Sequence, residues 1–278
     1  MIIEAGQAAV VTGAAQGLGR AIAAELAGRG VSVVLADLQD EAVHLAAEEI
    51  GGDGGTVWPA VVDVADADAV AGLAERALER FGRIDLVVNN AGIAPHEGTP
   101  LWEADLSHWR RVVDVNVFGV VHGVRAFVPH LVAAGRGHVV NIASLAGLAG
   151  TPLSASYGVT KHAVVALSEA LRAELDLLGH PIGVTVVCPG YIRTPMVEGM
   201  RDMTAMRDLA QRLGSDAAQI LDAIKETMRD MLEPEEAARR ILAAVQADLL
   251  HALPSGDIAD GARTRAQRIL DALDIQHH

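Results

Sequence analysis

The sequence predicts an α/β fold, a doubly wound parallel sheet with helices on both faces, in a single domain that spans residues 1–278. Six short runs rich in Val, Ile and Ala are almost entirely apolar, as expected of strands buried on both faces. Between them lie Ala-, Leu-, Glu- and Arg-rich stretches with helical spacing, so strands and helices alternate as in a parallel sheet. The expected strands cover residues 8–13, 31–37, 56–64, 84–92, 137–144 and 182–190.

Composition and charge restrict the partners of the chain. A hydrophobic content of 51% in 278 residues is enough for one large core. The net charge of −14 repels nucleic acid and anionic membranes, so we expect neither as a partner and a small-molecule substrate instead. Cys188 is the single cysteine, there is no His-Glu-x-x-His motif, and we expect no metal. The N-terminus does not read as a signal peptide, and no uninterrupted apolar run is long enough to span a bilayer. Because a single cysteine excludes any disulfide within the chain, we expect a reducing, cytoplasmic location.

The first expected strand ends in a glycine-rich turn that is typical of dinucleotide binding. Gly13, Gly17 and Gly19 separate this strand from a helical pattern, and Gln16 and Leu18 lie between the glycines. Glycines here allow a tight turn and let a pyrophosphate approach the backbone, with the N–H groups of the helix facing the phosphates. The alternative is an ordinary loop.

Asp37 indicates which dinucleotide is bound. It closes the second expected strand, 18 residues after Gly19, where a carboxylate can accept a hydrogen bond from a ribose 2′-hydroxyl. The same carboxylate repels a 2′-phosphate, and neither Gln16 nor Leu38 supplies a cation to hold one. We therefore expect NAD rather than NADP. The alternative is a turn or N-cap aspartate ahead of a helix at 40–50.

The third and fourth expected strands end in side chains that we expect beside the adenosine half of the cofactor. Asp63 and Val64 end the third strand, and Asn90, Ala91 and Gly92 close the fourth. The alternative for Asp63 is that it only forms a turn. The alternative for Ala91 and Gly92 is a close-packed corner of the chain.

Tyr157 and Lys161 are the candidate proton-transfer pair. They are four residues apart, so on one helix their side chains share a face. A proton-transfer role near neutrality needs a tyrosine pKa lowered by about 3 units, and an ammonium about 4 Å away supplies an interaction of that order. Ser144 closes the fifth strand with a hydroxyl for the substrate oxygen, and Asn116 lies within a helix. Each residue also has a structural alternative. Tyr157 could be an aromatic on the helix surface and Lys161 a solvated charge. Ser144 could cap a helix, and Asn116 could be a core amide with its hydrogen bonds satisfied.

Together the motifs form one ordered pattern. It comprises Thr12-Gly13-x-x-x-Gly17-x-Gly19, Asn89-Asn90-Ala91-Gly92, Asn116, Ser144, Tyr157-x-x-x-Lys161 and Pro189-Gly190. In order and spacing it resembles the short-chain dehydrogenase/reductase family, over about residues 5–255. The resemblance implies a Rossmann fold in which Tyr157 is the general acid/base and Ser144 orients the substrate. It also implies that Lys161 holds the nicotinamide ribose and lowers the pKa of Tyr157, while Asn116 fixes a water in the proton relay.

The resemblance extends to the rest of the cofactor site and to assembly. It implies that Asp63, Val64, Asn90, Pro189, Gly190, Ile192 and Thr194 line the cofactor, as do Tyr157 and Lys161, with Thr194 near the carboxamide. It also suggests a homo-oligomer, a tetramer or a dimer, in which the helices that hold Asn116 and Tyr157 pack between subunits.

The segment at about 193–232 is rich in methionine and is expected to be helical. Six of the seven methionines fall within it, and Met196, Met200 and Met203 follow i, i+4, i+7 spacing. We expect a mobile lid over an apolar alcohol or ketone, followed by a C-terminal extension at about 255–278. The alternative is that these methionines only seat the helices on the core.

The sequence therefore predicts an NAD-dependent oxidoreductase that interconverts a secondary alcohol and a ketone by hydride transfer, mainly toward oxidation. One alternative is an NADPH-dependent keto reductase, such as a 3-oxoacyl reductase. Another, of a different class, is a non-catalytic dinucleotide-sensing regulatory protein.

Overall fold

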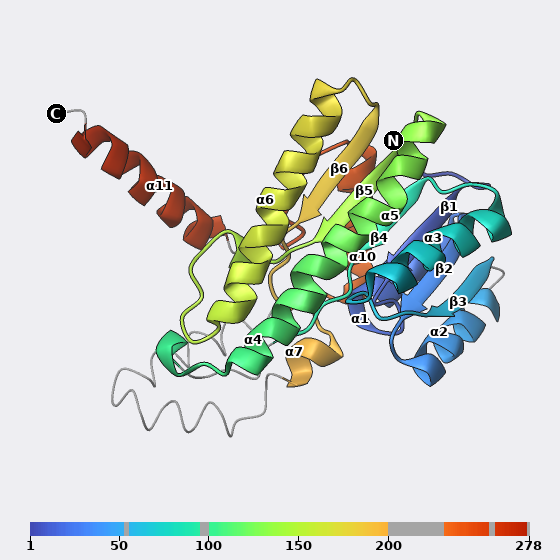
Figure 1. Cartoon of the computed structure of the whole chain (residues 1–278), viewed down its shortest axis with the longest axis horizontal. Coiled ribbons are helices and arrows are strands. Elements are labelled where there is room, and N and C mark those ends of the chain that lie inside the picture. The colour runs from blue at the N-terminus through green and yellow to red at the C-terminus, as the bar shows by residue number, and fades with distance from the viewer. Residues whose placement is uncertain (53–55, 95–99, 200–230, 256–258, 277–278) are drawn as a thin grey trace.

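Seven parallel strands form one sheet in the order β3-β2-β1-β4-β5-β6-β7 (Figure 1). The structure, a computed structural model, describes residues 1–52, 56–94, 100–199, 231–255 and 259–276. The strands are β1 Ala8–Thr12, β2 Ser32–Asp37, β3 Val57–Val61, β4 Leu86–Asn89, β5 Gly137–Ile142, β6 Ile182–Val187 and β7 His251–Ala252. Six of them lie where the apolar runs predict strands, which confirms the doubly wound fold. The two residues of β7 are too few to show a pattern, so the sequence did not predict it.

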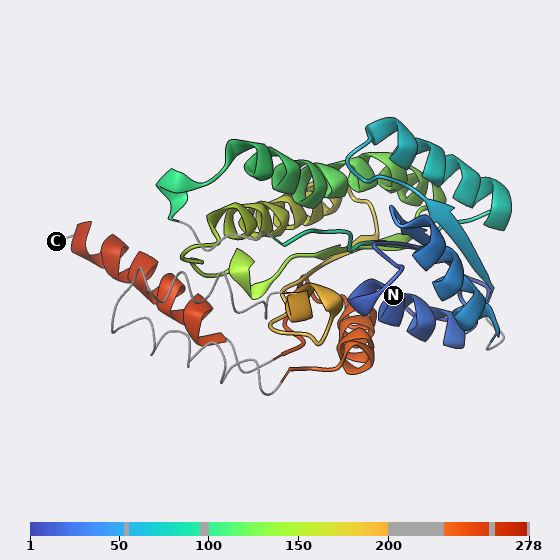
Figure 2. The ribbon, with the colours of Figure 1, turned by 90° about the horizontal axis from the view of Figure 1, so that it is seen from below.

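Helices cover both faces of the sheet (Figure 2). One face carries α1 Gly17–Gly28, α2 Asp40–Gly52 and α10 Pro234–Gln246. The other carries α3 Ala67–Phe81, α5 Gly119–Ala134 and α6 Ala155–Leu177. The remaining described helices are α4 Leu106–Val113, α7 Pro195–Gly199 and α11 Ala259–Gln276, with short helical turns η1 Leu101–Glu103, η2 Asp114–Phe118 and η3 Leu145–Gly147.

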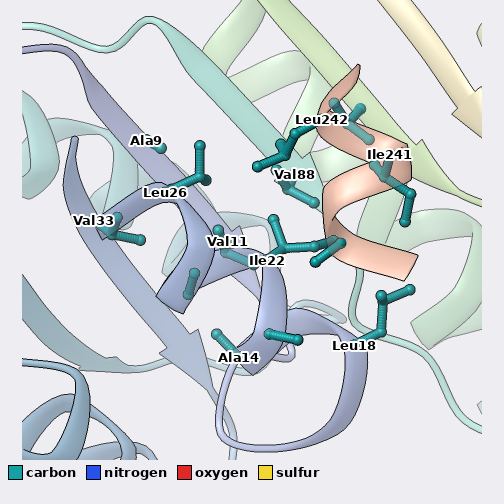
Figure 3. Close-up of a cluster of buried hydrophobic side chains, with 14 of the residues drawn as sticks. Ala9, Val11, Ala14, Leu18, Ile22, Leu26, Val33, Val88, Ile241 and Leu242 are labelled. Atoms are coloured by element: carbon teal, nitrogen blue, oxygen red, sulfur yellow. The ribbon is translucent and has the colours of Figure 1, made fainter. Parts of the chain in front are cut away.

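Alternate residues of each strand enter cores on opposite faces of the sheet. Val11 of β1 packs with α1 and α10, whereas its neighbour Val10 packs in the core beneath α3 and α5. In the first core, Ile22 of α1 lies against Ile241 and Leu242 of α10 (Figure 3). Each such fully buried side chain contributes about 2 kcal/mol to folding. Strands buried on both faces need no polar alternation, which is why the runs in the sequence are continuous.

A buried carboxylate ties together the amino ends of three strands. Asp85, just before β4, accepts hydrogen bonds from Arg83 at 2.7 Å, from the backbone N–H of Ala8 at 3.0 Å and from Arg136 at 3.3 Å. Burial opposes the charged form of Asp85, but these donors outweigh it and hold the pKa of Asp85 below its usual value. The network fixes β1, β4 and β5 at the end of the sheet opposite the candidate site.

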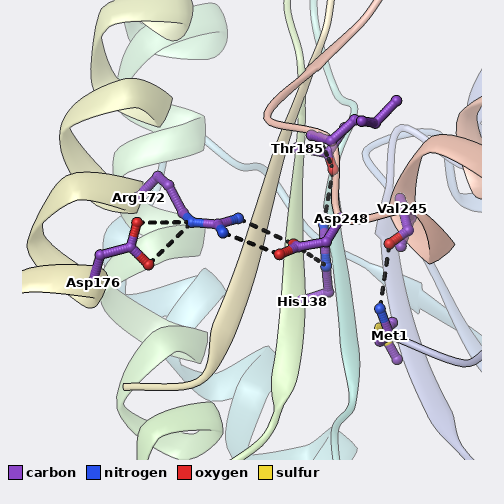
Figure 4. A network of polar contacts seen from close by, with 8 residues as sticks. Met1, His138, Arg172, Asp176, Thr185, Val245 and Asp248 are labelled. Atoms are coloured by element: carbon purple, nitrogen blue, oxygen red, sulfur yellow. Dashed lines mark hydrogen bonds and ion pairs between the residues drawn. The ribbon is translucent and has the colours of Figure 1, made fainter. Parts of the chain in front are cut away.

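A second polar network at the same end surrounds His138 of β5 (Figure 4). Thr185 donates its hydroxyl proton to the carbonyl of Leu249 at 2.8 Å, so Nε2 of His138, 2.8 Å from the same hydroxyl, must be the donor in that contact. The opposite ring nitrogen, Nδ1, lies 3.9 Å from Asp248, which is paired with Arg172 at 3.0 Å. Burial lowers the pKa of His138 to about 4, so the ring is neutral at physiological pH.

One helical stretch bears on the expectation that no apolar run is long enough to span a bilayer. Residues Leu106–Ala134, which include α4, η2 and α5, form 29 helical residues that by length and composition could cross a membrane. Phe127 and Leu131 from this stretch are buried in the core, although only 28% of its most apolar window is buried. The cytoplasmic location stays a prediction.

Most of the expected lid, including Met200 and Met203, lies outside the described residues. Its two ends are held together, because Ile192 pairs with Leu232 in a parallel bridge and the N–H of Arg193 donates to the Leu232 carbonyl at 3.0 Å. Met231 is buried, as expected if it packs on the core.

Candidate active site

One cavity of about 300 Å³ lies at the carboxyl ends of the strands. All the residues that the sequence predicts for the cofactor line it, together with Ser144. They are Gly13, Gln16, Gly17, Leu18, Gly19, Asp37, Leu38, Asp63, Val64, Asn90, Ala91, Gly92, Tyr157, Lys161, Pro189, Gly190, Ile192 and Thr194. Asn116 alone among the predicted site residues is not part of this lining.

The glycine-rich turn gives the cavity a floor of bare backbone. Gly13 and Gly17 have φ of 62° and 57°, a region that favours glycine. A Cβ on Gly19 would lie 2.2 Å from the carbonyl oxygen of Gly13, so no side chain fits there. Helix α1 begins at Gly17, earlier than the sequence pattern indicates, and its N-cap residue Gln16 makes no side-chain capping bond. The first N–H groups of α1 are therefore available to an anion.

Thr12 and Asn90 join the ends of β1 and β4 beneath this turn. The Thr12 hydroxyl accepts from the N–H of Asn90 at 3.0 Å and from the N–H of Ala91 at 3.1 Å. In return, the Asn90 side-chain amide donates to the carbonyls of Thr12 and Gly13 at 2.8 and 2.9 Å. The position of the glycine-rich turn thus depends on the residue after the fourth strand.

Asp37 combines the two roles that the sequence left open. One carboxylate oxygen accepts from the N–H of Ala15 at 3.0 Å and the other from the N–H of Gln39 at 3.0 Å. The second bond closes the turn into α2, as the turn alternative expects. Because each oxygen has a further lone pair, Asp37 is held rigidly at the cavity wall and can still accept a hydrogen bond.

Asp63 is likewise both a turn former and a wall residue. It accepts from the N–H of Ala65 at 2.9 Å, and its other oxygen lies 3.8 Å from Arg111 of α4. Arg111 lines the cavity too, and its charge is directed to Asp63 rather than to Asp37. The sequence analysis missed Arg111, because no spacing relates α4 to the end of β3.

Ser144 and Tyr157 meet at the opposite wall. Ser144 accepts from the N–H of Ala146 at 3.1 Å, which caps η3, and its side chain also hydrogen-bonds with that of Tyr157. Tyr157 is half-buried near the start of α6, and not a helix-surface aromatic. The two hydroxyl groups that the sequence selects are thus in contact with each other.

Lys161 lies one turn further along α6 and is buried. Its ammonium lies 5.5 Å from the centroid of the Tyr157 ring and donates to the carbonyl of Ile142 at 2.9 Å. Burial lowers the pKa of Lys161 to about 8. Near that pH a buried lysine alternates between charged and neutral forms, which a solvated lysine does not.

The pKa of Tyr157 departs from the expectation. Burial raises this pKa, the hydrogen bond with Ser144 opposes the increase, and Tyr191 adds to it. The expected decrease in this pKa depended on the charge of Lys161, whereas desolvation, which that expectation left out, is the largest influence on Tyr157.

The side chain of Asn116 forms hydrogen bonds with the backbone of Ile93. In the π-helical turn η2 it is fully buried, and its amide oxygen accepts from the N–H of Ile93 at 2.8 Å. Its amide nitrogen donates to the Ile93 carbonyl at 3.0 Å and to the Thr160 hydroxyl at 3.2 Å. These contacts join the segment after β4 to α6. The role in holding a water stays a prediction.

Other wall residues also escaped the sequence analysis. Gln39 lines the cavity beyond Asp37, and Pro195 lies beside Thr194 at the start of α7. The signal for Gln39 was its position two residues after a strand-end aspartate.

Comparisons with known proteins agree with this geometry. The family model for short chain dehydrogenases matches residues 7–205. The 1-deoxy-11-beta-hydroxypentalenate dehydrogenase of Streptomyces arenae is 45% identical over 197 residues, 70% of either chain. A short chain dehydrogenase/reductase of Burkholderia phymatum, solved in complex with NAD, has a TM-score of 0.84 and 32% identity, over 97% of this chain and 96% of that one. Levodione reductase has a TM-score of 0.76 and 31% identity, over 90% of this chain and 95% of its own.

Proposed function

The chain belongs to the short-chain dehydrogenase family, and from this premise we propose that it is an NAD-dependent dehydrogenase that interconverts a secondary alcohol and a ketone. That it is an oxidoreductase acting on hydroxyl groups follows from the family. NAD as the cofactor, Tyr157 as the general acid/base and oxidation as the main direction are the proposal.

The observation that carries the proposal is the continuity of one cavity. Gly13, Asp37 and Asn90 line the same space as Ser144 and Tyr157. A dinucleotide seated on the glycine-rich turn therefore has a proton-transfer group at the other end of its own site. A sensor that only binds the dinucleotide has no need of the contact between Ser144 and Tyr157.

The residues present fit NAD. The uncapped first turn of α1 offers N–H groups to a pyrophosphate, and Gly13 and Gly19 leave no side chain in the way. Asp37 offers a fixed acceptor to a ribose hydroxyl. Arg111 also lines the cavity, but its guanidinium faces Asp63 rather than Asp37. When bound, NAD supplies the hydride acceptor. A 2′-phosphate would meet the Asp37 carboxylate, which supports NAD over NADP.

Tyr157 is placed to move the proton of the alcohol. Because burial raises its pKa, the Tyr157 hydroxyl keeps its proton, as a group that acts as an acid toward a ketone must. Its action as a base needs nearby positive charge. A charged Lys161, 5.5 Å from the centroid of the Tyr157 ring, contributes about 3 kcal/mol if the phenolate charge is taken at that distance and the effective dielectric is about 20. Ser144, bonded to Tyr157, holds the substrate oxygen beside it.

The substrate proposed is an apolar alcohol. Met196 and Val197 of α7 line the cavity next to Thr194, where they offer apolar surface beside the catalytic wall. The name of the Streptomyces relative, 1-deoxy-11-beta-hydroxypentalenate dehydrogenase, describes a hydroxylated substrate. This supports an alcohol as the reduced form of the substrate.

The test is an assay of NADH formation on a panel of secondary alcohols, steroids and aryl carbinols, with NAD and with NADP. We expect turnover with NAD, and a loss of at least 100-fold in Tyr157→Phe with NADH affinity retained. Tyr191→Phe removes the other tyrosine of the chain and serves as the matched control. Full activity of Tyr157→Phe on every oxidised alcohol would refute the assignment, and a clear preference for NADP would refute the choice of cofactor.

We also propose a homo-oligomer in which α5 and α6 pack between subunits. Phe118 and Val159 expose 47% and 53% of their surface near the starts of these helices, as apolar interface residues do in an isolated protomer. Sedimentation velocity of the wild type and of Val159→Asp tests this, with a smaller particle expected for the variant. A monomeric wild type would contradict it.

A further inference from the structure

A second and larger cleft, of about 1550 Å³, lies beside the catalytic wall. It is formed by the C-terminal helix α11, the segment 149–155 and η1 with its preceding residue Pro100. None of the proposed catalytic residues lines it. The cleft exceeds the volume of about 300–1,000 Å³ that is usual for small-molecule sites, so it has room for a large ligand.

The walls of the cleft are apolar and exposed. Trp102 and Leu101 of η1 expose 84% and 59% of their surface, and Ile269 and Leu273 of α11 are about half exposed. Large apolar side chains gathered on two facing elements mark a surface that binds something.

The cleft also carries positive charge in an acidic protein. Arg265 and Arg268 of α11 line it and have no carboxylate partner among the described residues, whereas Arg263 on the same helix lies 3.9 Å from Asp260 and is not part of the lining. Glu103 is the one acidic residue among those lining the cleft and is engaged in an interaction of its own. Two arginines against one glutamate, in a chain with a net charge of −14, favour an anionic ligand.

One segment of the chain connects the cleft with the residues of the catalytic wall. Residues 149–153 and Ala155 line the cleft and lie between Ser144 and Tyr157 in the sequence, and Gly261 of α11 approaches Ala149. Leu153 in this segment has φ of 62°, a left-handed conformation that costs about 1 kcal/mol or more in a non-glycine residue and tends to persist at functional sites. Helix α11 also lies beyond residues 7–205, the part matched by the family model.

We propose that this cleft binds the distal part of the substrate, and that the substrate is an apolar hydroxy acid whose carboxylate pairs with Arg265 and Arg268. The apolar skeleton lies between η1 and α11, and the hydroxyl reaches Tyr157. This placement of the hydroxyl rests on the proposed function, while binding of the carboxylate in the cleft does not.

The experiment uses 12-hydroxyoctadecanoate and its methyl ester as probes, each titrated into the full chain without cofactor. Calorimetry gives the affinity, and fluorescence of Trp102 reports occupancy of the cleft, with Trp102→Phe as the signal control. We expect the acid to bind at least tenfold more tightly than the ester. In Arg265→Gln/Arg268→Gln, binding of the acid falls at least tenfold and binding of the ester is unchanged. Arg263→Gln, the matched control on α11, binds both as the wild type does.

Three outcomes overturn the proposal: no saturable binding of either probe, equal affinity for acid and ester, or unchanged affinity of the acid in the double variant. A fourth outcome combines two results: the double variant Ile269→Asp/Leu273→Asp sediments as a smaller particle than the wild type, and Trp102 fluorescence does not respond to the probes. The cleft is then an interface with a second copy of the chain. Turnover is measured separately. Binding without NADH formation leaves the cleft assignment intact and counts against the proposed function.

Discussion

The ammonium of Lys161 lies 5.5 Å from the centroid of the Tyr157 ring, yet its hydrogen bond goes to the carbonyl of Ile142 at 2.9 Å. The lysine is therefore positioned by the end of β5 rather than by the tyrosine. This arrangement leaves the Tyr157 hydroxyl bonded to Ser144, and leaves burial to dominate its pKa.

The first prediction concerns the ionisation of Tyr157. Because burial raises the pKa of Tyr157, its phenolate should form at higher pH than the phenolate of a solvent-exposed tyrosine. The measurement is the tyrosinate absorbance of the wild type minus that of Tyr157→Phe across pH 7–12. Added NAD should shift the difference to lower pH, because the nicotinamide brings positive charge. A phenolate already present at pH 8 without cofactor is the contrary result.

The second prediction concerns the choice of cofactor. Asp37→Ser removes the carboxylate that repels a 2′-phosphate, so the ratio of kcat/KM for NADP to that for NAD should rise at least tenfold. Asp40→Ser is the control, since Asp40 is an exposed acid at the start of α2 that does not line the cavity. An unchanged ratio in Asp37→Ser shows that another residue discriminates between the dinucleotides.

The third prediction compares two glycines of α1. A Cβ at Gly19 would lie 2.4 Å from the amide nitrogen of Asn90, whereas at Gly28 nothing lies within 4 Å. Gly19→Ala should lower the free energy of unfolding by about 3 kcal/mol and weaken NADH binding, as overpacking displaces the turn. Gly28→Ala should be neutral or stabilising by up to about 1 kcal/mol. Urea unfolding and fluorescence titration with NADH measure both; equal stability of the two variants would show that the turn tolerates a side chain.

The fourth prediction concerns stability below neutral pH. The pKa of His138 is about 4 in the folded chain and about 6.5 when unfolded, so between these values only the unfolded chain binds the proton. Stability from this group is complete above pH 6.5, is lost as the pH falls toward 4, and the loss amounts to about 3 kcal/mol. Urea unfolding at several pH values should show a shallower dependence for His138→Gln. The control His44→Gln, at an exposed position on α2, should keep the slope of the wild type.

The order of elements and most of the lining of the candidate site could be predicted from the sequence. Strands buried on both faces leave a continuous apolar run, and the carboxyl ends of parallel strands meet at one edge, so Gly13, Asp37 and Asn90 converge without any knowledge of distances. The contacts of Asn116 with Ile93 could not be predicted, since a buried amide has several possible partners and the π-helical turn leaves no spacing signal.

Desolvation and tertiary proximity account for what the sequence could not predict. The raised pKa of Tyr157 depends on the atoms packed around it, and the approach of Arg111 to Asp63 joins segments that no periodicity relates. The cleft beneath α11 depends on how that helix is seated, which the pattern of an exposed helix does not specify.

The two ends of the sheet carry different kinds of polar chemistry. Asp85 and the His138 network fix the strands from the amino end, so the residues at the carboxyl end are free to serve ligands. A selection for new substrates could therefore alter the loops at one end while mutations at the other restore stability. In this chain, activity and tolerance to heat or acid therefore depend on different residues at opposite ends of the sheet.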